Sequence, residues 1–232
     1  MKKIVLAIIL YSLVSPASGL AGAEPAVVYW DSAAGRTLRA RIPADADYWQ
    51  LSPAFAVQMT QSYCSVASAI TVLNAMPIKK PVDPAYAPYA YFTQNNFFTP
   101  EVIKVISPQT VLAIGMTREQ MAETLTRHGV RATSIAGDTL DDSTLRTLLQ
   151  KALGDDGRFV LANYLRANLG QAGAGHWSVL AAYDAQSDSV LILDVAKYKY
   201  VPAWVAISTL RQAIATIDTT SNKARGLVVV SK

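Results

Sequence analysis

The spacing of apolar residues changes along this chain, and this change constrains the fold more than any other feature of the sequence. Residues 64–76 have the continuous apolar density of a buried helix. Later in the chain the period becomes strand-like, in residues 158–164, 176–183, 190–195 and 226–230, with turn residues between these runs. Helices first and strands later predict an α+β fold, in which a helical half packs on an antiparallel sheet.

Proline, glycine and helix-capping residues mark the expected boundaries of helices in the rest of the chain. Pro77 ends the buried helix, and Thr117 with Gln120 forms a capping-box pattern for a helix that runs to His128, with Gly129 as its C-cap. Further expected elements are a helix capped by Ser143 that runs to 153, a strand at 27–30, an irregular segment at 47–55 and a loop at 81–100.

The first 23 residues have the pattern of a secretory signal peptide. Lys2 and Lys3 precede a short apolar stretch at 4–14, and residues 21–23 (AGA) fit a small-residue cleavage site before Glu24. An uncleaved anchor is the alternative, but the apolar run is too short for a comfortable membrane span. We therefore expect a signal peptide at 1–23, a mature domain at 24–232, export to the periplasm, and no stable membrane insertion after cleavage.

Composition describes a globular chain with few excess charges. Apolar residues make up 51% and charged residues 16% of the 232 residues, which favours a sizeable core over disorder. The net charge of +4 falls to +2 once Lys2 and Lys3 are removed, and the remaining lysines are scattered. The sequence therefore gives no basis for nucleic-acid binding.

Cys64 is the only cysteine, so it has no internal disulfide partner. An unpaired thiol in an exported chain is an inert core residue, an intermolecular bridge or a reactive group. Cys64 begins the predicted buried helix, and a helix N-terminus stabilises a thiolate through its partial positive charge and unpaired N–H groups. The position favours reactivity.

A nucleophilic thiolate needs a base and a group that orients the base. Of the two histidines, His128 suits a structural role at a helix C-terminus, whereas His176 begins a strand. Asp194 ends an apolar run, where a buried carboxylate requires a partner. A hairpin turn centred on residue 186 would place Asp194 opposite Ser178, and one centred on residue 185 would place it opposite His176.

Either register puts His176 and Asp194 on one face of the sheet, because side chains alternate along a strand. A satisfied structural aspartate is the alternative interpretation of Asp194. Gln58 and Gln61 precede Cys64, and a glutamine N–H can stabilise an oxyanion together with the backbone N–H of Cys64. Solvation of a loop would explain either glutamine equally well.

Several segments together carry a resemblance. Residues 58–68 (QMTQSYCSVAS) and 72–75 (VLNA) resemble the nucleophile segment of phytochelatin synthases, and residues 175–178 (GHWS) and 193–205 resemble the histidine and aspartate segments of that family. Residues 91–98, 162–166 and 224–226 also fit, in order and with matching spacing, over nearly all of the mature chain.

The resemblance implies a papain-like fold and an acyl transfer from glutathione. In that family glycine is released, a γ-glutamylcysteinyl thioester forms on the cysteine, and water or another thiol peptide accepts the acyl group. The match then implies Cys64 as nucleophile, His176 as base, Asp194 as orienting acid and Gln58 as oxyanion donor. It implies a substrate-binding role for Asn163, Arg225, Ser65 and Gly175.

Two departures modify this expectation. Ser65 stands where the family has glycine, and the sequence given ends at Lys232, without a cysteine-rich C-terminal region. We therefore expect no required cofactor, with cadmium or zinc entering only as thiolate complexes of glutathione or related thiol peptides, and we expect hydrolysis to exceed phytochelatin formation. A peptidase on the same scaffold and a non-catalytic thiol-peptide or metal-binding protein are the alternatives. The sequence leaves open whether the chain forms a homodimer.

Overall fold

The computed structural model describes residues 27–154 and 157–232. The expected signal peptide at 1–23 lies outside the described residues and stays a prediction. Within the described ranges, none of the helices combines the length and apolarity that a membrane span requires.

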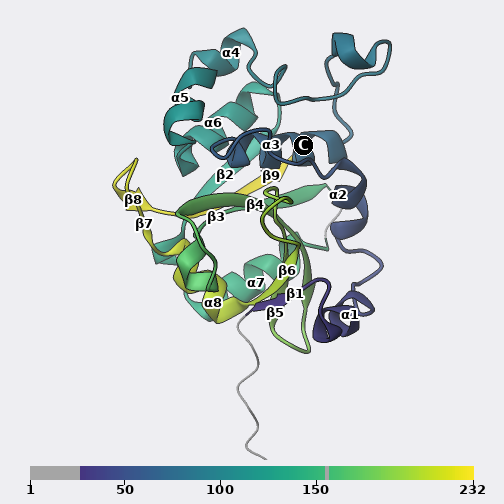
Figure 1. Ribbon diagram of the computed structural model, residues 1–232, viewed down its shortest axis with the longest axis vertical. Coiled ribbons are helices and arrows are strands. Elements are labelled where there is room, and N and C mark those ends of the chain that lie inside the picture. The colour runs from purple at the N-terminus through teal and green to yellow at the C-terminus, as the bar shows by residue number, and fades with distance from the viewer. Residues whose placement is uncertain (1–26, 155–156) are drawn as a thin grey trace, which may run out of the picture.

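A seven-stranded antiparallel sheet forms the centre of the molecule, in the order β1-β6-β5-β4-β3-β9-β2. Its strands are β1 (Val27–Tyr29), β2 (Arg131–Ala136), β3 (Arg158–Leu165), β4 (Gly175–Asp184), β5 (Ser189–Leu193), β6 (Ala203–Ala206) and β9 (Gly226–Ser231). A separate two-stranded hairpin, β7 (Ile217–Asp218) with β8 (Lys223–Ala224), projects beside the sheet (Figure 1).

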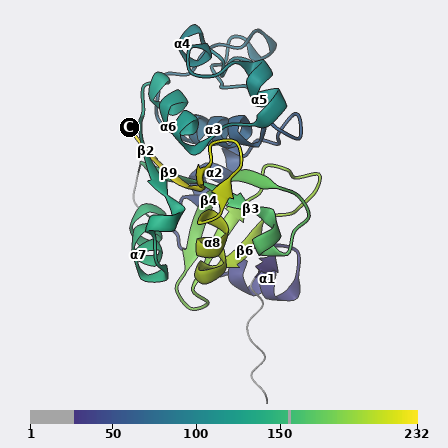
Figure 2. The ribbon, with the colours of Figure 1, turned by 90° about the vertical axis from the view of Figure 1, so that its left-hand side faces the viewer.

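Helices cover both faces of the sheet (Figures 1 and 2). On one side lie α3 (Cys64–Ala75), α4 (Pro100–Ile103), α5 (Pro108–Ile114) and α6 (Arg118–Arg127), and on the other lie α7 (Asp142–Ala152) and α8 (Ile207–Ile214). The remaining helical segments are α1 (Ala33–Arg39), α2 (Tyr48–Ala54) and the 3₁₀ turns η1 (Pro84–Tyr86), η2 (Gly137–Thr139) and η3 (Arg166–Leu169).

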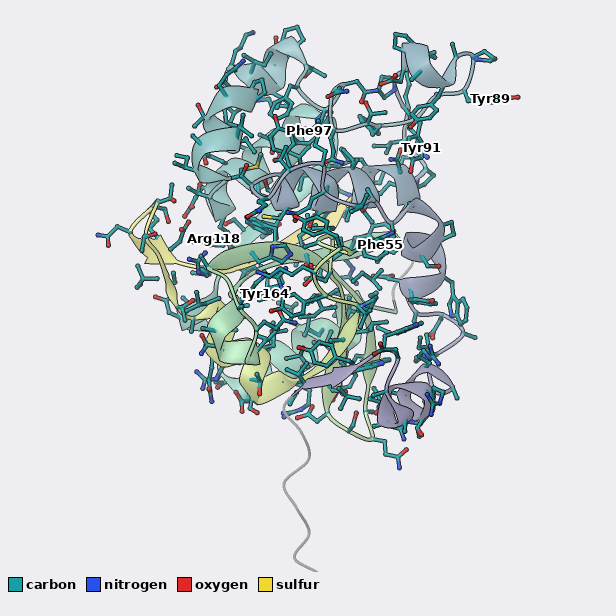
Figure 3. All side chains as sticks on the ribbon, in the orientation of Figure 1. Phe55, Tyr89, Tyr91, Phe97, Arg118 and Tyr164 are labelled. Atoms are coloured by element: carbon teal, nitrogen blue, oxygen red, sulfur yellow. The ribbon has the colours of Figure 1, made fainter. Side chains whose placement is uncertain are left out.

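Alternation along the central strands produces two hydrophobic clusters, one on each face. In β3, Phe159 and Leu161 belong to the cluster under α3, whereas Val160 and Tyr164 belong to the cluster over α7 and α8. Figure 3 shows Tyr164 beneath the sheet and the buried Phe97 above α3, on opposite sides of it. Both faces of the sheet are therefore covered, which is why its central strands are almost continuously apolar.

The predicted α+β architecture is confirmed, including the buried helix that begins at Cys64. The predicted capping box of Thr117 and Gln120 is present, but the helix ends one residue earlier than predicted. Its C-cap is His128, and Gly129, the predicted C-cap, follows at a φ of +83°. The positive φ explains the glycine, because an L side chain rarely adopts that conformation.

Two other local predictions were wrong. The segment at 47–55 is not irregular but contains the helix α2, which buries Leu51 and Ala54. The cap of α7 is not Ser143 but Asp141, whose Oδ1 accepts from the Thr144 N–H at 2.7 Å. Asp141 stands just before the first helical residue, where a side chain can accept from the third helical N–H. Ser143 lies inside the first turn and donates its hydroxyl to the same Oδ1 at 2.8 Å.

Candidate active site

The thiol of Cys64 lies buried at the first residue of α3. Helix α3 forms here because eleven of its twelve residues are buried against the sheet and the neighbouring helices, and its alanines allow close packing. The backbone N–H groups of Ser65 and Trp177 donate to the Cys64 sulfur. The predicted thiolate-stabilising position at a helix start is therefore present.

His176 and Asp194 meet across the hairpin that β4 and β5 form. Strand pairing of Val179 with Leu193 places Asp194 opposite Ser178, which is the first of the two registers considered. A β-bulge between Leu180 and Ala182 separates this register from the pairing nearer the turn. The His176 Nε2 and Asp194 Oδ1 atoms lie 2.9 Å apart.

The second ring nitrogen of His176 is thereby left for the nucleophile. The side chains of Cys64 and His176 are hydrogen-bonded to each other, and Tyr164 packs edge-on against the imidazole with ring centroids 5.7 Å apart. Nucleophile, base and orienting carboxylate are thus linked in one chain of contacts.

Arg166 is a site residue that the sequence reasoning missed. Its Nη1 and Nη2 donate to Asp194 Oδ2 at 2.7 Å and Oδ1 at 3.0 Å, and Nη1 also donates to Gln171 Oε1 at 2.6 Å. Both Arg166 and Asp194 are almost fully buried. The signal was present in the sequence, since a buried aspartate requires a partner, but the spacing did not say which arginine.

The charges of these groups are mutually dependent. Burial alone raises the pKa of the Cys64 thiol, but the charge of His176 and the hydrogen bonds to the sulfur more than offset it, so the pKa is lowered. Burial lowers the pKa of His176, and the charge of Cys64 with the bond to Asp194 reverses this, so the pKa is raised. Burial raises the pKa of Asp194, but hydrogen bonds and charges from His176 and Arg166 hold it at about 2. These directions favour a thiolate–imidazolium pair beside an ionised carboxylate.

A cavity of about 170 Å³ opens beside Cys64. Asn163, Gly175 and Arg225, three of the residues predicted to bind substrate, line it. The Arg225 Nη1 donates to Asn163 Oδ1 at 3.0 Å, and the guanidinium lies so close over Gly175 that a Cβ there would be 2.1 Å from Nη1. The absence of a Cβ at Gly175 therefore leaves the space that the Arg225 guanidinium occupies in the lining of the cavity.

Asp218 is a second residue that the sequence reasoning missed. It ends β7, lines the same cavity, and its Oδ1 lies 3.7 Å from Arg225 Nη1. Within the described chain the buried Arg225 Nε has no hydrogen-bond partner. The cavity thus presents one cation and one anion side by side, with part of the cation unsatisfied.

Gln58 and Ser65, the other predicted residues of the site, do not line the cavity beside Cys64. Gln58 is buried, and its Nε2 donates to Thr60 O and Tyr198 Oη, both at 2.8 Å. Ser65 is fully buried, does not line the cavity beside Cys64, and its Oγ has no partner among the described residues. Its backbone N–H, rather than its hydroxyl, reaches the thiol.

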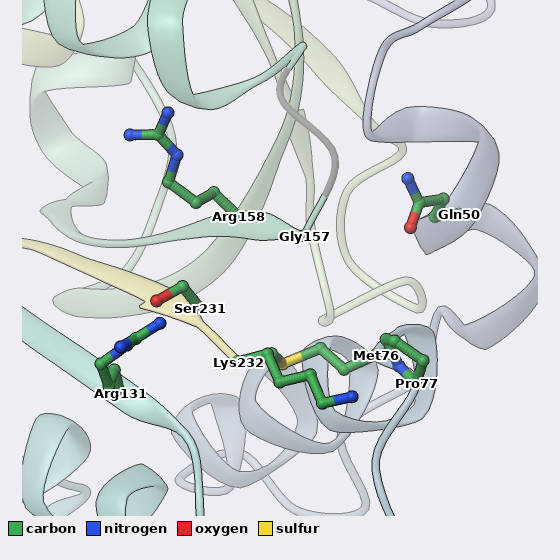
Figure 4. A pocket seen from close by; sticks show the side chains of 8 residues that line it. All are labelled: Gln50, Met76, Pro77, Arg131, Gly157, Arg158, Ser231 and Lys232. Atoms are coloured by element: carbon green, nitrogen blue, oxygen red, sulfur yellow. The ribbon is translucent and has the colours of Figure 1, made fainter.

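Another cavity, of about 640 Å³, lies at the opposite end of β3 from Asn163 (Figure 4). Arg131, Arg158 and Lys232 line it, and none of the residues placed around Cys64 does.

Over residues 27–154 and 157–232, no three His, Cys, Asp or Glu side chains converge in a group that could hold a metal ion.

Comparisons with known proteins agree on one family. The family model described as phytochelatin synthase matches residues 23–227. Relatives include glutathione gamma-glutamylcysteinyltransferase 3 of Lotus japonicus, 30% identical over 188 residues, which are 80% of this chain and 37% of that protein. Glutathione gamma-glutamylcysteinyltransferase 1 of Triticum aestivum is 29% identical over 217 residues, 94% of this chain and 41% of that protein. The chain thus spans about two-fifths of the length of these relatives.

Proposed function

Since the chain belongs to the phytochelatin synthase family, we propose that it cleaves glutathione at the cysteinyl–glycine bond and transfers the γ-glutamylcysteinyl group to water or to another thiol peptide. The single observation that carries the proposal is the cavity beside Cys64, which holds Arg225 and Asp218 together. The relatives are named for this transfer.

The cavity suits a γ-linked glutamyl group for a chemical reason. Such a group keeps both its α-ammonium and its α-carboxylate free, so it ends in a zwitterion. Arg225 can bind the carboxylate in a bidentate manner, Asp218 can bind the ammonium, and Asn163 orients Arg225. An α-linked peptide would place an amide where the free carboxylate is required.

The reaction follows from the contacts of the three catalytic groups. The Cys64 thiolate attacks the carbonyl carbon of the cysteinyl–glycine bond, and the charge moves onto the carbonyl oxygen. His176 gives its proton to the departing glycine nitrogen, and the carbon–nitrogen bond breaks to leave a thioester on Cys64. His176 then takes a proton from the attacking water or acceptor amine, the new bond forms, and Cys64 leaves as the thiolate.

Acid quenching during turnover tests this proposal. Intact-protein mass measurement should find an adduct of one γ-glutamylcysteinyl group on the wild-type chain and none on Cys64→Ala, with glycine release lost in the variant. An α-Glu-Cys-Gly peptide should be cleaved far more slowly than glutathione. Undiminished glycine release by Cys64→Ala would overturn the proposal, and equal cleavage of the α-linked peptide would favour a general peptidase.

Two finer points belong to the same proposal. Residues 1–23 support export to the periplasm, and N-terminal sequencing of protein from its host should begin at or near Glu24; a retained Met1 would contradict export. Cadmium or zinc should act as a thiolate complex of glutathione. Analysis of the products formed from glutathione, with and without cadmium, measures whether this complex alters the transfer.

A further inference from the structure

The loop that follows β5 contacts both the orienting acid and the predicted oxyanion donor. Asp194 opens this loop, and its Oδ1 accepts from the backbone N–H of Ala196 at 2.9 Å. The backbone N–H of Gln58 donates to Val195 O at 2.9 Å, and Lys197 Nζ donates to Phe55 O at 2.8 Å. These hydrogen bonds therefore hold the loop against the segment that carries Gln58.

Tyr198 extends this contact to the side chain of Gln58. As a whole Tyr198 is 60% exposed, yet its hydroxyl lies 2.8 Å from the Nε2 of Gln58, which is itself only 4% exposed. An exposed tyrosine has many solvated rotamers, so ordering its hydroxyl against a buried amide costs side-chain entropy. The contact therefore selects one orientation of both side chains.

Among the described residues, the carboxamide of Gln58 has no hydrogen bond to any other side chain. Its second Nε2 contact is the backbone carbonyl of Thr60, and its Oε1 is buried without a partner among the described residues. The two acceptors on Nε2 are unlike each other. A backbone carbonyl is fixed, whereas a phenol on an exposed loop can share the N–H with a second oxygen.

We propose that Tyr198 is a positioning residue for Gln58. Its hydroxyl accepts one N–H of the carboxamide and holds that N–H in place until the oxyanion of the acylation step shares it. This inference rests on the proposed function and on the oxyanion role that the family resemblance implies for Gln58. Because preorganised donors lower the barrier without binding the ground state more tightly, the effect should fall on kcat and not on KM.

A double-mutant cycle in the full chain tests the inference. With glutathione as substrate, Tyr198→Phe should lower kcat by roughly tenfold to a hundredfold at unchanged KM, somewhat less than the cost of deleting an oxyanion donor outright. Gln58→Ala should lower kcat at least as much. Adding Tyr198→Phe to Gln58→Ala should then cost nothing further, because the tyrosine acts through the glutamine.

Tyr89→Phe is the matched control, since Tyr89 is 76% exposed and lies on the loop at the far end of the molecule (Figure 3). Thermal unfolding of each variant separates loss of activity from loss of folding. A wild-type kcat for Tyr198→Phe, or a raised one, would overturn the inference. So would a full cost of Tyr198→Phe in the Gln58→Ala background, which would mean that the phenol acts directly. Loss of activity in Cys64→Ala alongside any of these results would leave the proposed function standing.

Discussion

Asp194 accepts three hydrogen bonds besides the one from the imidazole. Two come from the guanidinium of Arg166 and one from the backbone N–H of Ala196. A buried carboxylate with this many donors stays ionised at a low pH, which fits its pKa of about 2. Arg166 therefore fixes the position and the charge of the group that orients His176.

Arg166 also contributes positive charge near the thiol, and this leads to a prediction on the pH profile of the enzyme. The charges of Arg166 and Cys64 interact, so removing the cation should raise the pKa of Cys64. In Arg166→Gln, the acid limb of kcat/KM should therefore move to higher pH, and kcat should fall at least tenfold because Asp194 is no longer held.

Arg166→Lys is the control for charge alone. It keeps the cation and loses the bidentate geometry, so kcat should fall while the acid limb stays in place. Initial rates measured across the pH range distinguish the two variants. An unchanged acid limb in a folded Arg166→Gln would contradict the electrostatic role.

At the scale of elements, the end of α6 packs on the segment that precedes α4. The imidazole of His128 lies between two rings, with centroids 5.2 Å from Phe92 and 4.8 Å from Phe97. Its Nε2 is buried without a hydrogen-bond partner within the described residues. This confirms the structural role expected for His128, which supports the helical layer that covers α3.

The environment of His128 predicts that acid destabilises the protein. Burial lowers the pKa of His128 to about 4, from an ordinary value of 6.5. The unfolded chain therefore binds more protons between these values, so the free energy of unfolding should fall as the pH falls from 6.5 to 4, by about 3 kcal/mol in total. Above pH 6.5 this contribution is fully present.

Urea unfolding at several pH values measures the effect. His128→Gln does not titrate at this position, so its free energy of unfolding should decline less steeply than that of the wild type between pH 6.5 and 4. The pKa of Asp194 affects stability only at lower pH, and that of His176 at higher pH, so neither masks the difference. Parallel curves for the two proteins would show that the imidazole is not desolvated.

At the scale of the molecule, one sheet supports two hydrophobic clusters. Leu73 of α3 is fully buried in one cluster, and Leu210 of α8 is fully buried in the other, with the central strands between them. The strands contribute alternate side chains to the two clusters. Loss of packing on one face should therefore loosen the other through the shared strands.

Truncation on either face should destabilise the whole molecule. Leu73→Ala and Leu210→Ala should each lower the free energy of unfolding by about 2–5 kcal/mol, because each leaves a cavity in a close-packed core. Both variants should unfold in a single transition, with tryptophan fluorescence and far-ultraviolet circular dichroism coinciding. Two separate transitions in either variant would show that the helical layers unfold independently.

The sequence by itself determined the features that depend on local patterns. The apolar run from Cys64, the capping box at Thr117 and the strand-like period of the C-terminal third were sufficient for the α+β class and for the helix-start nucleophile. Alternation placed His176 and Asp194 on one sheet face, and the ordered motifs were sufficient for the family. Helix propensity is a weak guide in short segments, which is why the predictions for residues 47–55 and for the cap of α7 were wrong.

Only the tertiary structure decided which partners these groups take. Arg166 reaches Asp194 from 28 positions earlier, Asp218 meets Arg225 at the edge of the cavity, and Tyr198 reaches Gln58 across 140 positions. A buried charge or amide requires some partner, and the sequence states that need. Which side chain meets it depends on how strands and loops distant in the sequence pack together, because hydrogen bonds and ion pairs act only over a few ångströms.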